Sequence, residues 1–279
     1  MNVQRLTAFA TEQGGGNPAG VVIEERSIPE PEMRRIAREV GYSETAFAVR
    51  EESGNADWRV RYFSPSSEVP FCGHATIALG ATLAQRFGNG RYSLRLNDST
   101  ISVEGVSSPT GMSATLHSPP TSNAPVPKTL LQDALDLFGY DSSEIDDSLP
   151  PALINGGGNH LLLAVKHRET LARMRYDLAR GKKLMDSHGL VTIDLVFVRN
   201  HTTFDARNPF ASGGVYEDPA TGAAAAALAG YLRDIDWPMG DRIDIYQGED
   251  MGHPSHIVVQ PPESPGGSAG VSGLVRPIE

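Results

Sequence analysis

The chain has little of what would tie it to a membrane, to nucleic acid or to an oxidising compartment. Its 279 residues include one cysteine, Cys72, which excludes an internal disulfide framework and favours a reducing compartment. Lys and Arg total 24 against 34 Asp and Glu, and the net charge of −10 repels phosphate backbones, so we expect no nucleic-acid partner. No apolar run approaches the ~18 residues that cross a bilayer, and no signal-peptide pattern opens the chain. We therefore expect a soluble cytoplasmic protein without a membrane partner.

Glycine and proline are frequent, with 29 and 20 residues, which predicts short, strand-rich elements rather than long helices. Residues 117–128 contain four prolines and are interpreted as an interdomain linker, and residues 261–270 as a second loop. These breaks predict two domains, 1–118 and 129–262. Residues 271–279 are expected to return to the first domain, as chain ends often lie near each other.

The apolar pattern is of α+β type, with one Ala-rich helix in each half. The helices Gly73–Gln85 and Gly222–Arg233 are apolar on nearly all sides, so each is expected inside a curved sheet or barrel. The other expected helices are Glu30–Val40, Thr129–Leu137 and Glu169–Arg175, and the expected strands are Gln4–Phe9, Gly20–Glu24, Thr45–Val49, Trp58–Phe63, Tyr92–Leu96, Met112–Leu116, Leu161–Val165 and Leu195–Arg199.

The two Ala-rich helices begin with similar sequences. Residues 68–83 (EVPFCGHATIALGATL) align without gaps to residues 217–232 (EDPATGAAAAALAGYL), with 7 of 16 positions identical. A Gly-Asn pair also precedes an apolar strand in each half, from Gly16 and from Gly158. Chance is a fair alternative for either match alone, but two matches in the same order predict a pseudo-twofold, two-domain protein. Two helix N-termini facing one cleft would offer backbone N–H groups to a carboxylate or an enolate.

Three segments carry a more specific signature: SETAF (43–47), FSPSSEVPFCGHAT (63–76) and EDPATG (217–222). Together with the leading GNPAGVV segment they resemble the PhzF family, the phenazine-biosynthesis-protein-like isomerases of the diaminopimelate epimerase and proline racemase superfamily. The resemblance implies two similar domains of diaminopimelate-epimerase-like fold, each a sheet rolled around a central helix. It also implies an active site between the domains, catalysis without a cofactor, and a homodimer.

Glu44 is the first catalytic candidate. It opens a strand whose alternation places Ala46 and Ala48 on its face, and burial of its carboxylate against a cleft would raise its pKa into the range of a general acid/base. The residues alone favour the alternative of a solvated glutamate at a strand end. The resemblance assigns Glu44 to the family's acid/base position.

Cys72 and His74 stand at the start of the first buried helix. A Cys/His pair suggests a thiol nucleophile, but two side chains this close in sequence need not converge, and a buried inert cysteine is the commoner case. In the thiol racemases the position of Cys72 is catalytic, and the second thiol would fall at Thr221, which cannot supply one. Cys72 is therefore interpreted as a packing residue. His74 matches a family active-site histidine and is expected to bind substrate or relay a proton.

Asp218 matches a further family active-site acid, and its alternative is a carboxylate that caps a helix. The family often has serine directly after Thr-Gly, where this chain has Ala223, so one polar contact is missing and the phenazine-pathway substrate is placed in doubt. The expected substrate-binding positions are Cys72, Gly73, Thr221, Gly222, Ala223, Asn17, Gly158 and Asn159.

Other features give weaker signals. The Gly156–Gly158 run lacks the context of a nucleotide-binding loop and is interpreted as a cleft turn, where His160 is a possible lining residue. His253 and His256 have no third ligand nearby in sequence, so no metal is expected. Arg207 is either a clamp for a substrate carboxylate or a surface charge.

The leading hypothesis is a cofactor-independent isomerase that moves a proton on a small carboxylate-bearing metabolite, with Glu44, His74 and Asp218 as catalytic residues. A second hypothesis is a small-molecule binding protein that kept the cleft and lost turnover, which Ala223 favours. A third, a Cys–His hydrolase, is disfavoured because no orienting Asn or Asp accompanies Cys72.

Overall fold

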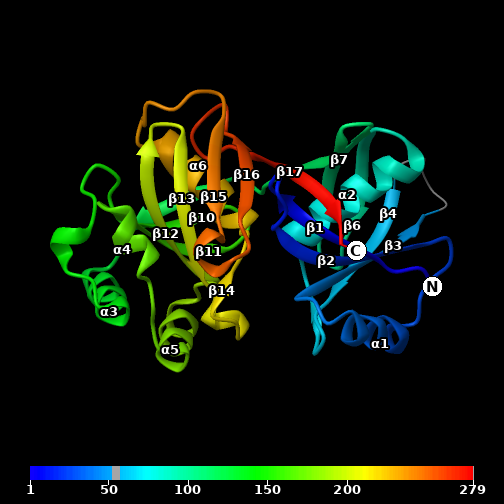
Figure 1. Ribbon diagram of the computed structural model, residues 1–279, viewed down its shortest axis with the longest axis horizontal. Helices are drawn as coiled ribbons and strands as arrows, with labels where there is room; N and C mark the ends of the chain where they lie inside the picture. Colours follow the sequence, from blue (N-terminus) through cyan, green and yellow to red (C-terminus); the bar gives the residue numbers. More distant parts are fainter. Residues whose placement is uncertain (52–56, 279) are drawn as a thin grey trace. The chain divides into compact units, whose positions relative to one another are not determined.

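The computed structural model describes residues 1–51 and 57–278 and is of α+β class. The chain divides into two compact units, Met1–His117 with Ser272–Glu279, and Ser118–Val271 (Figure 1). Within residues 1–51 and 57–278, every helix is too short or too polar to span a bilayer.

The first unit is a closed ring of strands around one helix. The strand pairings run β1–β2–β3–β4–β6–β7–β8–β17 and return to β1, and α2 packs against strands on several sides of this ring (Figure 1). A short strand, β5, pairs with the end of β4. The bounds are β1 Gln4–Ala10, β2 Asn17–Glu24, β3 Glu44–Arg50, β4 Asp57–Phe63, β5 Glu68–Val69, α2 Gly73–Phe87, β6 Gly90–Arg95, β7 Thr100–Ser108, β8 Gly111–His117 and β17 Gly270–Pro277.

The composition of α2 explains its place inside the ring. Its side chains from His74 to Ala84 are all buried, as expected of a helix that is surrounded by protein. A Cβ on Gly80 would lie 2.5 Å from a methyl carbon of Val103, and one on Gly105 would lie 2.1 Å from the Gly80 carbonyl oxygen. These two glycines therefore let α2 lie directly against β7.

Helix α1 (Glu30–Val40) covers the outside of the same unit. It connects the parallel strands β2 and β3, a connection that needs a crossover. Met33, Ile36, Ala37 and Val40 form its buried face, and they pack in one cluster with Val22, Ile28, Phe47 and Phe63. Gly41 ends the helix in the left-handed conformation, with φ of 74°. The predicted bounds of this helix are confirmed.

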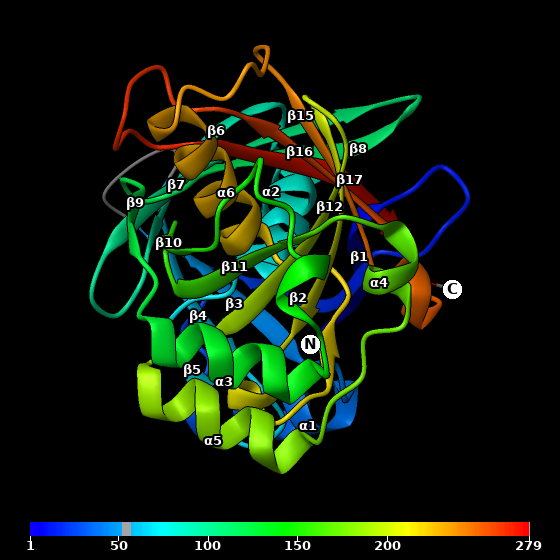
Figure 2. The ribbon, with the colours of Figure 1, turned by 90° about the vertical axis from the view of Figure 1, so that its left-hand side faces the viewer.

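The second unit repeats the scheme around α6. Helices α3 and α5 lie side by side outside its strands, where they share a hydrophobic cluster (Figure 2). Helix α6 packs against β9, β10, β11 and β16. The bounds are β9 Ser122–Pro125, α3 Lys128–Phe138, β10 Ala152–Asn155, β11 Asn159–Val165, α4 Arg168–Ala172, α5 Leu178–His188, β12 Thr192–Asn200, β13 Thr203–Pro209, β14 Glu217–Asp218, α6 Gly222–Asp234, β15 Ile243–Gln247 and β16 Ser255–Gln260, with three short 3₁₀ turns at Ser142–Glu144, Ala211–Gly213 and Glu249–Met251.

Strand directions in the two units follow the same order. In the first unit β1–β2 is antiparallel, β2–β3 parallel, β3–β4 antiparallel, β4–β6 parallel and β6–β7 antiparallel. In the second unit β10–β11, β11–β12, β12–β13, β13–β15 and β15–β16 repeat that order. The central helix follows the short strand β5 in one unit and β14 in the other. The predicted fold class of two pseudo-symmetric domains, each with a sheet curved around a central helix, is confirmed.

Several sequence-based expectations need correction. Residues 122–125, inside the expected linker, form β9, which pairs with β10. Helix α5 was not predicted because its sequence is mostly polar and only Gly181 and Met185 are buried. The strand at β13 was also missed, since its seven residues include Asp205, Arg207 and Asn208, all of them buried.

Candidate active site

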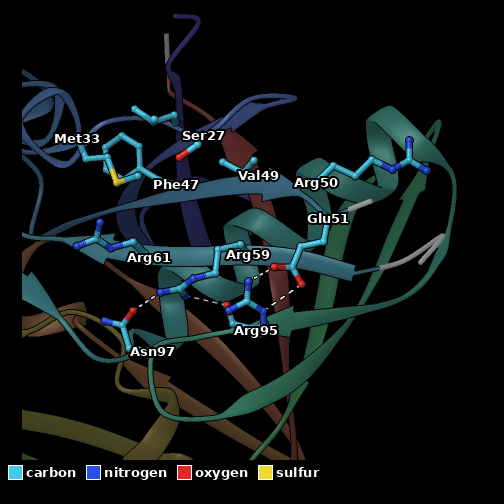
Figure 3. A pocket seen from close by; sticks show the side chains of 11 residues that line it. Ser27, Met33, Phe47, Val49, Arg50, Glu51, Arg59, Arg61, Arg95 and Asn97 are labelled. Carbon is cyan, nitrogen blue, oxygen red and sulfur yellow. Dashed lines mark hydrogen bonds and ion pairs between the residues drawn. The ribbon is translucent and has the colours of Figure 1, made fainter. Parts of the chain in front are cut away.

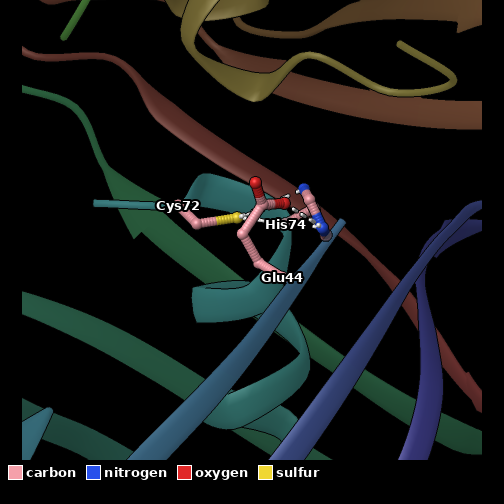
Figure 4. A group of neighbouring side chains, drawn as sticks. All are labelled: Glu44, Cys72 and His74. Carbon is pink, nitrogen blue, oxygen red and sulfur yellow. Dashed lines mark hydrogen bonds and ion pairs between the residues drawn. The ribbon is translucent and has the colours of Figure 1, made fainter. Parts of the chain in front are cut away.

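Glu44, Cys72 and His74 lie together at the start of the central helix of the first unit (Figure 4). Glu44 is the first residue of β3, and Cys72 is the N-cap of α2 in extended conformation. His74 is the second residue of α2. The side chain of Glu44 is 17% exposed and that of His74 is 8% exposed.

Three short contacts connect these side chains. The Cys72 thiol donates to Oε2 of Glu44 at 3.5 Å, and Nε2 of His74 lies 3.4 Å from the same oxygen. The Cys72 sulfur lies 3.4 Å from Nδ1 and 3.7 Å from Nε2 of His74. The Ser43 hydroxyl lies 3.4 Å from Nε2 of His74. A carboxylate, a thiol and an imidazole, all groups that can move protons, thus share one small space.

Cys72 and His74 are two residues apart and need not converge at that spacing, but in the structure their side chains do converge. Cys72 directly precedes the first turn of α2 and has an extended backbone, with φ of −146° and ψ of 115°. Two hydrogen bonds hold that turn, because the Thr76 hydroxyl donates to the Cys72 carbonyl at 2.7 Å and lies 2.6 Å from the Tyr62 hydroxyl. Cys72 is buried, at 8% exposure, which agrees with a packing role. That interpretation of Cys72 stays a prediction.

A second cluster surrounds the start of α6. The Thr221 hydroxyl donates to Oδ2 of Asp218 at 2.6 Å. The Gln247 side chain accepts from the Thr221 N–H at 3.1 Å, and its amide donates to the Asp218 carbonyl at 2.7 Å and to the Thr221 hydroxyl at 3.0 Å. Gln247 therefore fixes both the backbone and the hydroxyl that position Asp218.

Sequence reasoning missed Gln247. It stands at the end of β15, 26 residues beyond Thr221, and is 1% exposed. The one available signal was a lone amide in an otherwise alternating strand, IDIYQ, and an amide in that position does not disclose its partner. At the start of α6, Gly222 and Ala223 are half-buried, so their backbone N–H groups remain near the surface of the unit.

Other predicted binding residues have varied surroundings. Asn17 is buried at the start of β2, and Gly73 has open space where a Cβ would be. Asn159 is exposed, and its side chain accepts from the Asn155 amide at 2.7 Å and donates to the Gly189 carbonyl. Gly158 lies close to the His160 ring, because a Cβ on it would be 3.4 Å from Nε2.

His160, a possible cleft-lining residue from the sequence, is fully buried and belongs to a chain of polar side chains. The Asn208 amide donates to Asp194 at 2.9 Å, the Thr192 hydroxyl donates to the Asn208 oxygen at 2.7 Å, and Nδ1 of His160 lies 2.7 Å from that hydroxyl. Since the Thr192 proton is used, Nδ1 carries a proton and donates, which leaves Nε2 as an unprotonated acceptor. Burial lowers the pKa of His160 to about 3 and raises the pKa of Asp194 to about 7.

Arg207 is neither a substrate clamp nor a surface charge. Its side chain is 8% exposed and donates to both carboxylate oxygens of Glu217, at 2.9 and 2.6 Å. It also donates to the carbonyls of Leu171 and Ala172. A guanidinium whose donors are used in this way is a structural ion pair, so both earlier interpretations of Arg207 are wrong.

Two further features lie outside these clusters. His256 binds Asp244 at 2.7 Å and stacks on Tyr246, and His253 is not part of that arrangement. A pocket of about 620 Å³ in the first unit is lined by several arginines (Figure 3). Arg61 pairs there with Glu30 and Glu68. Arg95 pairs with Glu51, and none of Glu44, Cys72 and His74 lines the pocket.

The chain is similar to known proteins over nearly its whole length. A family model described as phenazine biosynthesis-like protein matches residues 6–265. The chain belongs to the PhzF family. An uncharacterised isomerase from Deinococcus radiodurans is 32% identical over 263 residues, which cover 91% of this chain and 85% of that relative. The trans-2,3-dihydro-3-hydroxyanthranilate isomerase of Pseudomonas aeruginosa is 30% identical over 264 residues, covering 90% and 87% of the two chains.

A solved PhzF-family protein from Bacillus anthracis has the same fold. Its TM-score is 0.85 at 21% identity, covering 100% of this chain and 98% of that one. The two-domain fold is shared more widely with proline-racemase-like proteins. This PhzF chain is thus a member of a family that includes isomerases, and the predicted resemblance is confirmed.

Proposed function

We propose that the protein is a cofactor-independent isomerase that moves a proton on a small carboxylate-bearing metabolite, with Glu44 as the acid/base. The observation that carries this proposal is the position of Glu44, whose carboxylate is partly exposed and in contact with a thiol and an imidazole. Family membership and the isomerases among its relatives support the reaction class.

In the proposed reaction, Glu44 removes a proton from carbon and returns it to a different position or face. The carbanion that forms needs stabilisation, and backbone N–H groups at the first turn of each central helix, at Gly73 and Gly222, are suited to a developing enolate. His74 and Asp218 orient the substrate or relay the proton. We propose that both helix N-termini bind one substrate in a cleft between the two domains of the same chain. We also propose that the protein is a homodimer.

The second candidate is a binding protein without turnover. It is favoured by Ala223, which stands where the family resemblance implies a serine hydroxyl beside the substrate. Ala223 also suggests a substrate other than that of the phenazine pathway, because one polar contact to it would be missing.

Proton–deuterium exchange separates the two candidates. The wild type is incubated in deuterated buffer with a panel of small amino, hydroxy and unsaturated acids, and deuterium on carbon is read by mass spectrometry. An isomerase incorporates deuterium into at least one acid, and Glu44→Gln lowers that rate by at least ~10²-fold. The matched control Glu25→Gln, at an exposed turn, keeps the wild-type rate. A binding protein without turnover would behave differently. One of the acids would raise its melting temperature, but no deuterium would be incorporated into that acid.

A further inference from the structure

We propose that Glu44, Cys72 and His74 form a binding site for a single zinc-like divalent ion, and that this ion inhibits the protein. Within residues 1–51 and 57–278, Glu44, Cys72 and His74 are a group of three metal-ligating side chains, and their donor atoms all lie within 4.8 Å of one another. The ion is an inhibitor in this proposal and not a cofactor, so the expectation of metal-independent catalysis is unchanged.

The distances within the group match those of a zinc coordination shell. A tetrahedral ion with Zn–S near 2.3 Å and Zn–N and Zn–O near 2.0–2.2 Å has ligand atoms about 3.3–3.6 Å apart. Here the sulfur–oxygen distance is 3.5 Å, the Nε2–oxygen distance 3.4 Å and the sulfur–Nε2 distance 3.7 Å. The site is therefore nearly preformed, and binding needs mainly the Nε2 lone pair to be aimed at the ion.

The donor types select the ion. A thiolate and an imidazole favour zinc and its neighbours among the transition metals, whereas magnesium and calcium prefer oxygen ligands. Three protein ligands leave one tetrahedral position for water. Binding releases the Cys72 proton, so the thiol's hydrogen bond to Glu44 is exchanged for two bonds to the ion, and the affinity rises with pH.

The framework around the group is rigid enough to hold this geometry. Cys72 and His74 sit on the first turn of α2, which the Thr76 hydroxyl ties to the Cys72 carbonyl. Glu44 begins β3, whose next residues are buried. Elsewhere in the described chain, His256 and Asp244 form a His–carboxylate pair without a thiol, and this pair serves as an internal control.

Inhibition follows if Glu44 is the base, so this part of the proposal rests on the proposed function. A carboxylate oxygen bonded to an ion cannot remove a proton from carbon. Zinc should then suppress deuterium exchange, and a chelator should restore it.

Cobalt(II) provides a direct test that does not depend on activity. The reduced protein is titrated with Co²⁺, and the thiolate-to-cobalt charge-transfer band in the near ultraviolet is recorded. We expect one Co²⁺ per chain, displaced by Zn²⁺. We expect no band in Cys72→Ser, and at least tenfold weaker binding in His74→Ala and Glu44→Gln. His256→Ala should bind as the wild type does, and circular dichroism checks the folding of each variant.

The outcomes separate the two proposals. Absence of a charge-transfer band in the wild type, or an unchanged affinity in folded His74→Ala and Glu44→Gln, overturns the metal site while leaving the isomerase proposal intact. A normal titration with no effect of Zn²⁺ on deuterium exchange establishes the metal site but contradicts both inhibition and the role of Glu44 as base.

Discussion

The two units of this protein share one strand order and differ in the chemistry that it carries. The repeat places Thr221 and Ala223 where the first unit has Cys72 and His74. Strand register extends this comparison to Glu44. The Gly-Asn segments of the two halves align Ala19 with Leu161. Glu44 pairs with Ala19 and Ile193 pairs with Leu161, so the second unit has an isoleucine at the position of Glu44. Among residues 1–51 and 57–278, a trio of proton-active side chains of this kind therefore occurs in the first unit alone.

The second unit supplies a differently built helix N-terminus. Asp218 is held by Thr221, and Gln247 holds both, whereas the first unit anchors its helix through Tyr62 and Thr76. A repeated fold thus keeps the two helix N-termini and allows the side chains around them to diverge. In the proposed mechanism, one unit moves the proton and the other orients the substrate.

An arginine–glutamate pair occurs in both units and offers the sharpest comparison of stability. Arg61 and Glu68 have side chains 21% and 20% exposed, but Arg207 and Glu217 are only 8% and 3% exposed. Arg207→Met should lower the free energy of unfolding by about 3–5 kcal/mol, because it leaves the Glu217 charge buried alone. Arg61→Met should cost about 1 kcal/mol or less. Urea unfolding at pH 7 measures both, and equal losses would contradict the comparison.

The buried chain through Asp194 predicts a pH dependence that belongs to the second unit. In the folded protein the pKa of Asp194 is raised to about 7, above the ordinary value of 3.8. Between pH 3.8 and pH 7 the folded state therefore holds a proton that the unfolded state has lost. This contribution to stability is present below pH ~4 and is lost as pH rises to ~7. Asp194→Asn should therefore become more stable relative to the wild type over that range, by on the order of 4 kcal/mol.

Thermal unfolding of the wild type and Asp194→Asn at several pH values measures this difference. A gap between the two proteins that stays constant from pH 4 to pH 7 would show that Asp194 is ionised in the folded state throughout.

The anchors of the two helix N-termini should differ in cost. Gln247→Met leaves the buried Thr221 N–H without its acceptor and should destabilise by about 1–3 kcal/mol. Tyr62→Phe removes one hydroxyl contact and should cost about 1 kcal/mol. In the exchange assay, Gln247→Met should lower turnover more than substrate affinity, because it displaces Asp218 without removing it. A purely structural Gln247 would leave turnover unchanged in the folded variant.

The sequence predicted the parts of the fold that rest on local patterns. Helix α1 has a clear apolar face and a glycine at its end, and the all-apolar helices α2 and α6 could only be central. The motif repeat predicted the pseudo-symmetry. The family motifs singled out Glu44 and His74, which lie together, but the convergence of Cys72 on them was not predicted.

What sequence reasoning missed depends on contacts between distant segments. Arg207 resembled a surface charge because its partner Glu217 lies ten residues away across a strand pair. Gln247 and the His160 chain join residues of separate strands, and no local pattern marks them. Strand β9 lies in the proline-rich segment and pairs along its whole length with the short strand β10, an arrangement that composition does not indicate.

The central claim is that Glu44, and not Cys72, moves the proton. The most direct measurement is the rate of substrate deuteration in Glu44→Gln and Cys72→Ala, side by side with the wild type. We predict a loss of at least ~10²-fold for Glu44→Gln with substrate affinity nearly kept, and a far smaller loss for Cys72→Ala. If Cys72→Ala abolishes exchange while Glu44→Gln retains it, a thiol is the base and the proposed mechanism is wrong.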